Sequence, residues 1–124
     1  MFSIEEIHDM LDDIAETLPE EVFYKLNGGI SLVPDIKRSH NDPYGGLYTL
    51  GEYRRDQMGR YIVIYYGSIC AVYPHLTEEQ MRVRLEDLLK HELTHHLESM
   101  AGERDLEIED KRKLDNYLRG KWHD

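Results

Sequence analysis

The sequence predicts an α+β domain in which a small, mostly antiparallel or mixed sheet packs on a long helix, with further helices near both ends of the chain. Helical apolar spacing occupies both ends of the sequence, and β-branched and aromatic residues gather in residues 47–66. The order is helices, then strands, then helices, which differs from the strand–helix alternation of a parallel sheet. A length of 124 residues with 40% apolar content predicts one domain over residues 1–124.

The first helix is predicted from a capping box. Ser3 is followed three residues later by Glu6, and apolar residues then recur at helical spacing: Ile4, Ile7, Leu11, Ile14 and Leu18. Pro19 can open a second, short helical stretch that residues 27–29 (Asn-Gly-Gly) end. Residues 30–33 are then predicted to form a strand.

The middle of the chain is predicted to hold a loop and a hairpin. Residues 34–46 contain two prolines and a Gly-Gly pair, which favour a loop. Residues 47–53 and 60–66 have strand character and are separated by turn residues, so we expect them to pair. Cys70, the only cysteine, excludes an internal disulfide, and its apolar neighbours indicate a packed thiol.

A long helix follows the hairpin. Thr77 and Gln80 form a second capping box, and Gly102 is the expected end of the helix. Its buried stripe is predicted to contain Met81, Leu85, Leu88, Leu89, Leu93, Leu97 and Met100. Residues 106–118 show a last, strongly charged helical pattern.

The charge balance excludes some partners. Lys and Arg number 15 against 25 Asp and Glu, which gives a net charge of −10 and argues against nucleic acid and anionic membranes as partners. The chain starts without a basic segment and has no long apolar run, so we expect a cytoplasmic protein. The sequence does not set an oligomeric state.

The chemistry is concentrated in residues 91–95, which read His-Glu-Leu-Thr-His. Positions four apart share a helix face, so His91 and His95 can bind one Zn²⁺ while Glu92 faces a metal-bound water as general base. Both histidines fall on one flank of the apolar stripe. The alternative is a chance match on a solvated face of a chain rich in His and Glu, which would leave a metal-free acidic interaction domain.

A third metal ligand is needed, because catalytic zinc usually takes three from the protein. The candidates are Glu98, Glu103, Asp105, Glu107 and Glu109. Glu98 shares the face of His95, but three ligands from one straight helix would hold the ion too close to that helix. We favour Asp105, since Gly102 lets the chain turn back. Asp105 would also suit the N-cap of the last helix, and those two roles compete.

The chain resembles the small bacterial zincin-like metallopeptidase family proteins, which are minimal zincins. The resemblance covers residues 18–21, 46–48, 62–65 and 91–96. It implies a stripped-down zincin fold, zinc bound by two histidines and an aspartate, and a glutamate base.

On this sequence the resemblance assigns zinc to His91 and His95 and the base to Glu92. Family members commonly end H-E-x-x-H-H-x-G-x-x-D, and Asp105 takes the last place when four additional residues are allowed before Gly102. In zincins the strand before the active helix forms the upper rim of the cleft, so residues 60–66 are expected to pair with a peptide. The alternative for these residues is an ordinary sheet strand.

Further site residues stay open at this point. Tyr48, Tyr65, Tyr66 and Tyr117 are candidates for an oxyanion donor, and the sequence does not choose among them. His96 points about 100° from His95 and is expected at the surface or bonded to nearby backbone. The other histidines are expected at the surface: His8, His40, His75 and His123.

The predicted function is a zinc-dependent metallopeptidase of narrow specificity that acts on a peptide or protein substrate. A base between the two histidines favours this function, since a structural zinc site has no use for one. The alternative is a non-catalytic zinc-binding regulatory or interaction module. Four protein ligands would indicate the module, and an open position for water would indicate the enzyme.

Overall fold

The computed structural model of the protein describes residues 1–39, 47–104 and 106–120. The helices are α1 (Ile4–Glu16), the 3-10 helix η1 (Glu20–Phe23), α2 (Tyr66–Val72), α3 (Glu78–Gly102) and α4 (Ile108–Gly120). The strands are β1 (Gly29–Val33), β2 (Lys37–Arg38), β3 (Tyr48–Thr49), β4 (Gly51–Asp56) and β5 (Gly59–Tyr65). The protein therefore has an α+β fold with a small mixed sheet, as predicted.

The main sheet has the strand order β1-β5-β4. Its central strand, β5, runs parallel to β1 and antiparallel to β4, and β2 and β3 form a separate pair. The hairpin expected between residues 47–53 and residues 60–66 is confirmed by the pairing of β4 with β5. The expectation that residues 60–66 pair with a peptide is wrong, because β1 and β4 occupy both edges of β5. Within the described residues, β4 is paired along one edge only.

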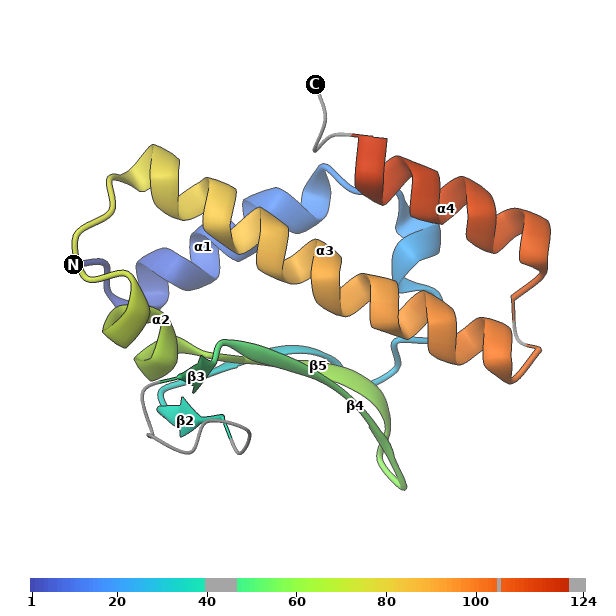
Figure 1. Ribbon diagram of the computed structural model, residues 1–124, viewed down its shortest axis with the longest axis horizontal. Coiled ribbons are helices and arrows are strands. Elements are labelled where there is room, and N and C mark those ends of the chain that lie inside the picture. The colour runs from blue at the N-terminus through green and yellow to red at the C-terminus, as the bar shows by residue number, and fades with distance from the viewer. Residues whose placement is uncertain (40–46, 105, 121–124) are drawn as a thin grey trace.

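The helices cover one face of the sheet. Figure 1 shows the sheet nearly edge-on, with α1, α3 and α4 on the same side and α3 between the other two. Helix α3 contacts α1, α4, η1 and β4. Alternate residues of β5, among them Ile62 and Ile64, are fully buried beneath the helices. The apolar stripe of α3 is buried as predicted, at Met81, Leu85, Leu89, Leu93, Leu97 and Met100, whereas Leu88 is only partly buried.

The helix starts follow the local sequence signals. Both capping boxes are present, at Ser3 with Glu6 and at Thr77 with Gln80. Helix α3 ends at Gly102 as expected, but the left-handed residue that reverses the chain is Arg104, with φ of 63°. Helix α2 is not predicted from the sequence, because its short segment continues the apolar pattern of β5.

Gly51 allows β4 to approach the long helix closely. A Cβ atom at this position would lie 3.2 Å from Cδ1 of Leu88 and 3.3 Å from the carbonyl oxygen of Val63. Even a methyl group there would require these neighbours to shift by a few tenths of an ångström, so the glycine suits the close packing of β4 on α3, the helix that carries the histidine motif. Across the ranges that the structure describes, no helix is both long and apolar enough to cross a membrane.

Candidate metal centre

The imidazoles of His91 and His95 converge on one point beside α3. Their Nε2 atoms lie 3.2 Å apart, and the rings are nearly perpendicular at 89° with centroids 4.7 Å apart. Two Zn–N bonds of 2.0–2.1 Å at a tetrahedral angle would separate the nitrogen atoms by about 3.3–3.4 Å. The pair therefore fits two ligands of one zinc ion, as the spacing of the motif predicts. Both histidines are exposed, so an ion could reach them from solvent.

Glu92 lies beside the histidines but is buried, with 5% of its surface exposed. Burial raises the pKa of its carboxyl group, while the nearby imidazoles and the backbone N–H of Tyr53 act in the opposite direction. A carboxylate that is partly desolvated and held by a backbone N–H is a suitable proton acceptor. The structure thus places the predicted base next to both predicted metal ligands.

These side chains line an open cleft of about 640 Å³ between α3 and β4. Its lining residues are Gly51, Glu52, Tyr53, His91, Glu92, His95, Glu98 and Ser99. The sequence does not predict the contribution of β4. Which strand of the hairpin lies at the edge of the sheet depends on the pairing of β1 with β5, for which the sequence holds no local signal.

Glu52 is a partly buried carboxylate of the cleft that is held in an ion pair. Its carboxylate accepts hydrogen bonds from Nζ of Lys37 and from the hydroxyl of Tyr65, the latter at 2.6 Å. Burial by itself would raise the pKa of Glu52, but these two hydrogen bonds and the charges of Lys37 and Arg54 outweigh it and lower the pKa to about 2. Glu52 is therefore ionised at every physiological pH, and its charge is balanced by Lys37 and Arg54.

His96 is fully buried and bonded to backbone, so of its two expected environments the surface position is wrong and the backbone hydrogen bond is confirmed. Its Nε2 lies 2.8 Å from the carbonyl oxygen of Tyr24, and its Nδ1 lies 2.9 Å from the hydroxyl oxygen of Tyr53. A carbonyl only accepts, so Nε2 carries the proton and the Tyr53 hydroxyl donates to Nδ1. Burial lowers the pKa of His96, which keeps the ring neutral at pH 7.

Two alternatives for the third metal ligand, Glu98 and Glu103, interact with other side chains. Oε1 of Glu98 lies 4.0 Å from Nδ1 of His95, on the side of the ring away from Nε2, where it could orient the ring. Glu103 pairs with Arg55 through one carboxylate oxygen and with Arg60 through the other, at 3.1 Å in the second case.

The other acidic candidates lie on the far side of the turn after α3. Glu107 borders a different pocket, between η1 and α4, and Glu109 is exposed in the first turn of α4. Asp105, the favoured ligand, lies outside the described residues. Among the residues that the structure does describe, no third ligand is in place within 4.8 Å of both histidines.

One other group could hold a metal ion within the described part of the chain. His8, Asp9 and Asp12 are exposed on α1, with their ligand atoms within 4.8 Å of one another. Nδ1 of His8 lies 3.4 Å from Oδ2 of Asp12, which is also the geometry of an ordinary i,i+4 pair. His8 and His75 are exposed, as expected, and His40 and His123 lie outside the described residues.

Three of the four candidate tyrosines have hydroxyl groups with identified partners. Tyr65 donates to Glu52, Tyr66 to the carbonyl oxygen of Phe2, and Tyr117 to that of Thr17. Tyr48 stacks under the guanidinium of Arg38. None of these four tyrosines lines the cleft, and the tyrosine that does is Tyr53.

Comparison with known proteins finds a solved structure with a similar fold. No protein-family model and no curated protein matches the chain. The structure is similar to that of a conserved hypothetical protein from T. thermophilus, with a TM-score of 0.68 and 28% sequence identity. The match covers 82% of this chain and 99% of the other. This relative carries no assigned activity, so the likeness extends to the α+β architecture alone.

Proposed function

We propose that the protein is a zinc-dependent metallopeptidase with a minimal zincin-like fold. The observation that carries this proposal is the 3.2 Å separation of the Nε2 atoms of His91 and His95 next to the buried carboxyl group of Glu92. The resemblance to small bacterial zincin-like proteins supports it and supplies Asp105 as the third ligand.

The residues of the cleft have distinct roles in this proposal. His91, His95 and Asp105 would hold a zinc ion, which would supply a water of lowered pKa and a Lewis acid for the peptide carbonyl. Glu92 takes the proton of the attacking water and returns it to the leaving amine. The backbone N–H of Tyr53 holds the carboxylate in place. Tyr53 is in turn fixed by His96, so the base is positioned by a fully buried residue.

The open edge of β4 is the proposed binding site for an extended peptide. Gly51, Glu52 and Tyr53 of this strand line the same cleft as the histidines. A peptide added to β4 would continue the sheet and pass the metal centre. Because the exposed Glu98 lines the cleft and the net charge of the chain is −10, basic or neutral peptides should bind better than acidic ones.

The test is the zinc content of protein purified without a histidine tag, together with hydrolysis of a quenched-fluorescence peptide library. The variants are His95→Ala, Glu92→Gln and, as a matched control, His8→Ala in the exposed cluster on α1. We expect one zinc per wild-type chain, no zinc in His95→Ala, and unchanged zinc in His8→Ala. Glu92→Gln should keep zinc and lose hydrolysis.

Other results would favour a different metal site or a different function. Zinc that stays in His95→Ala but leaves His8→Ala would move the site to α1. Zinc bound by the wild type without hydrolysis of any peptide in the library would favour the non-catalytic zinc-binding module. A wild-type protein that takes up no zinc on reconstitution would overturn the proposal.

A further inference from the structure

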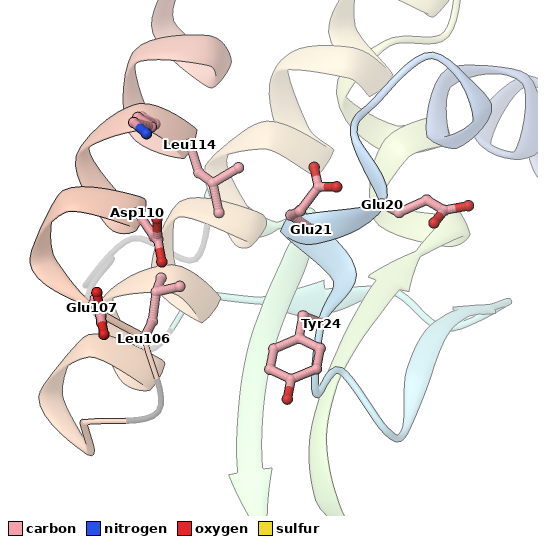
Figure 2. A pocket seen from close by; sticks show the side chains of 8 residues that line it. Glu20, Glu21, Tyr24, Leu106, Glu107, Asp110 and Leu114 are labelled. Atoms are coloured by element: carbon pink, nitrogen blue, oxygen red, sulfur yellow. The ribbon is translucent and has the colours of Figure 1, made fainter.

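A second hollow lies between η1 and α4, and none of its described lining residues belongs to the histidine cleft. It is a groove of about 830 Å³ lined by Glu20, Glu21, Tyr24, Leu106, Glu107, Asp110, Lys113 and Leu114. Figure 2 shows Leu114 projecting toward Glu21 of η1, with Asp110 and Leu106 beside it and Tyr24 at the other end of the groove. We call this surface the η1–α4 groove.

The floor of the η1–α4 groove is apolar and accessible. Tyr24 is 58% exposed, and Leu106 and Leu114 are only partly buried. Partly buried apolar side chains that border a hollow of this volume gain free energy when a partner covers them.

The rim of the η1–α4 groove is acidic. Among the described lining residues, Glu20, Glu21, Glu107 and Asp110 are exposed, against Lys113 as the one cation. The ammonium of Lys25 lies over the ring of Tyr24, 5.6 Å from its centroid. Four carboxylates still outnumber these two ammonium groups, so the described rim has a net negative charge.

Acidic residues at the start of η1 and α4 suit the dipoles of those helices, and this explains why the fold tolerates them. It does not account for the accessible leucines and tyrosine between them. The apolar floor and the acidic rim are therefore two separate observations. Together they make the groove complementary to a ligand in which an apolar side chain is flanked by cations.

We propose that the η1–α4 groove binds a segment of another protein in which an apolar side chain is flanked by Lys or Arg. The apolar side chain would pack on Leu106 and Leu114, and the cations would pair with Glu21 and Asp110. A second copy of this chain is a poor occupant, because its net charge of −10 opposes binding to an acidic rim. This binding goes beyond the proposed function, since none of its residues belongs to the metal centre.

The test is fluorescence anisotropy with a short labelled peptide in which Leu alternates with Lys, at low salt and with a chelator present. A peptide in which Glu replaces Lys is the control ligand. The test variant is Glu21→Gln with Asp110→Asn. The matched control variant is Asp9→Asn with Asp12→Asn on α1, which changes the net charge by the same amount at another exposed surface. Circular dichroism checks that both variants are folded.

We expect the Leu/Lys peptide to bind and the Leu/Glu peptide not to bind. The groove variant should weaken binding on the order of 5-fold or more, and the α1 variant less than about 2-fold. Tyr24→Ser should also weaken binding, because it removes apolar floor but keeps the backbone carbonyl that His96 needs. Wild-type affinity in the double variant His91→Ala/His95→Ala would show that binding is independent of the metal centre.

Three results would overturn the proposal. The Leu/Lys peptide could fail to bind the wild type. The groove variant and the α1 variant could weaken binding equally, which would assign the effect to net charge alone. Sedimentation could show that the wild type self-associates through this face and that Glu21→Gln/Asp110→Asn abolishes the association, which would make a second copy the occupant.

Discussion

The Nδ1 atom of His96 lies 2.9 Å from the hydroxyl oxygen of Tyr53, which joins the long helix α3 to the edge strand β4 beside the candidate metal centre. The preceding residue, His95, is exposed in the cleft. Two neighbouring histidines therefore serve opposite purposes, because a step of about 100° around the helix turns one toward solvent and the other into the core.

Replacing His96 with Leu is expected to lower the free energy of unfolding by about 2–4 kcal/mol, since the partly buried hydroxyl of Tyr53 and carbonyl of Tyr24 both lose a fully buried partner. Urea denaturation at pH 7 measures the change. His95→Leu is the matched control and should change stability by less than about 0.5 kcal/mol without metal, because its side chain is exposed. Equal losses in the two variants would contradict a structural role for the His96 hydrogen bonds.

Glu103→Gln is expected to lower stability by about 1–3 kcal/mol and to leave zinc binding intact. The carboxylate pairs with Arg55 and Arg60, and the side chain of Arg60 is only 10% exposed, so a nearly buried guanidinium would lose the negative charge of Glu103. Asp105→Asn should instead lose zinc, as the family resemblance implies. Metal analysis and thermal unfolding of both variants separate the two roles. Zinc loss in Glu103→Gln would make Glu103 the third ligand.

The ion pair of Glu52 should make stability depend on pH in the acid range. Its pKa is lowered from 4.5 to about 2 in the folded protein, so its contribution is complete above pH 4.5 and is lost as the pH falls toward 2. The contribution is at most on the order of 3 kcal/mol. Urea midpoints of the wild type and Glu52→Gln should therefore converge as the pH falls. Glu98→Gln, in the same cleft but exposed, should show no such convergence.

Arg104→Gly is expected to stabilise the protein by up to about 1 kcal/mol. Arg104 has φ of 63°, a left-handed conformation that glycine adopts without the steric cost of a Cβ atom. Arg112→Gly in the middle of α4 is the matched control and should destabilise by about 1 kcal/mol. Thermal unfolding gives both values. Destabilisation in Arg104→Gly would mean that the arginine side chain contributes more than its backbone strain costs.

The sequence predicts the parts of this fold that depend on local signals. The capping boxes at Ser3 and Thr77 set the starts of α1 and α3, because each is completed by a side chain three residues away. The convergence of His91 and His95 is equally local, since a four-residue step along a helix fixes it.

The errors arise where partners lie far apart in the chain. The sequence leaves His96 open between a surface position and a backbone hydrogen bond, because its two partners, Tyr53 and Tyr24, are 43 and 72 residues away. The same limit applies to the rim of the cleft, which the resemblance to zincins implies at residues 60–66, the strand before the active helix. The strong strand propensity of these residues marks a buried central strand rather than an edge.

The open edge of β4 also bears on how the protein behaves at high concentration. An unpaired strand can recruit the same strand of another molecule and start a continuous sheet. In β4, four of the six residues are charged, and Arg55 is held by Glu103 at the end of α3. Charged side chains along a free edge oppose stacking of one copy on the next. The strand can thus stay available to a short peptide while the protein remains dispersed in solution.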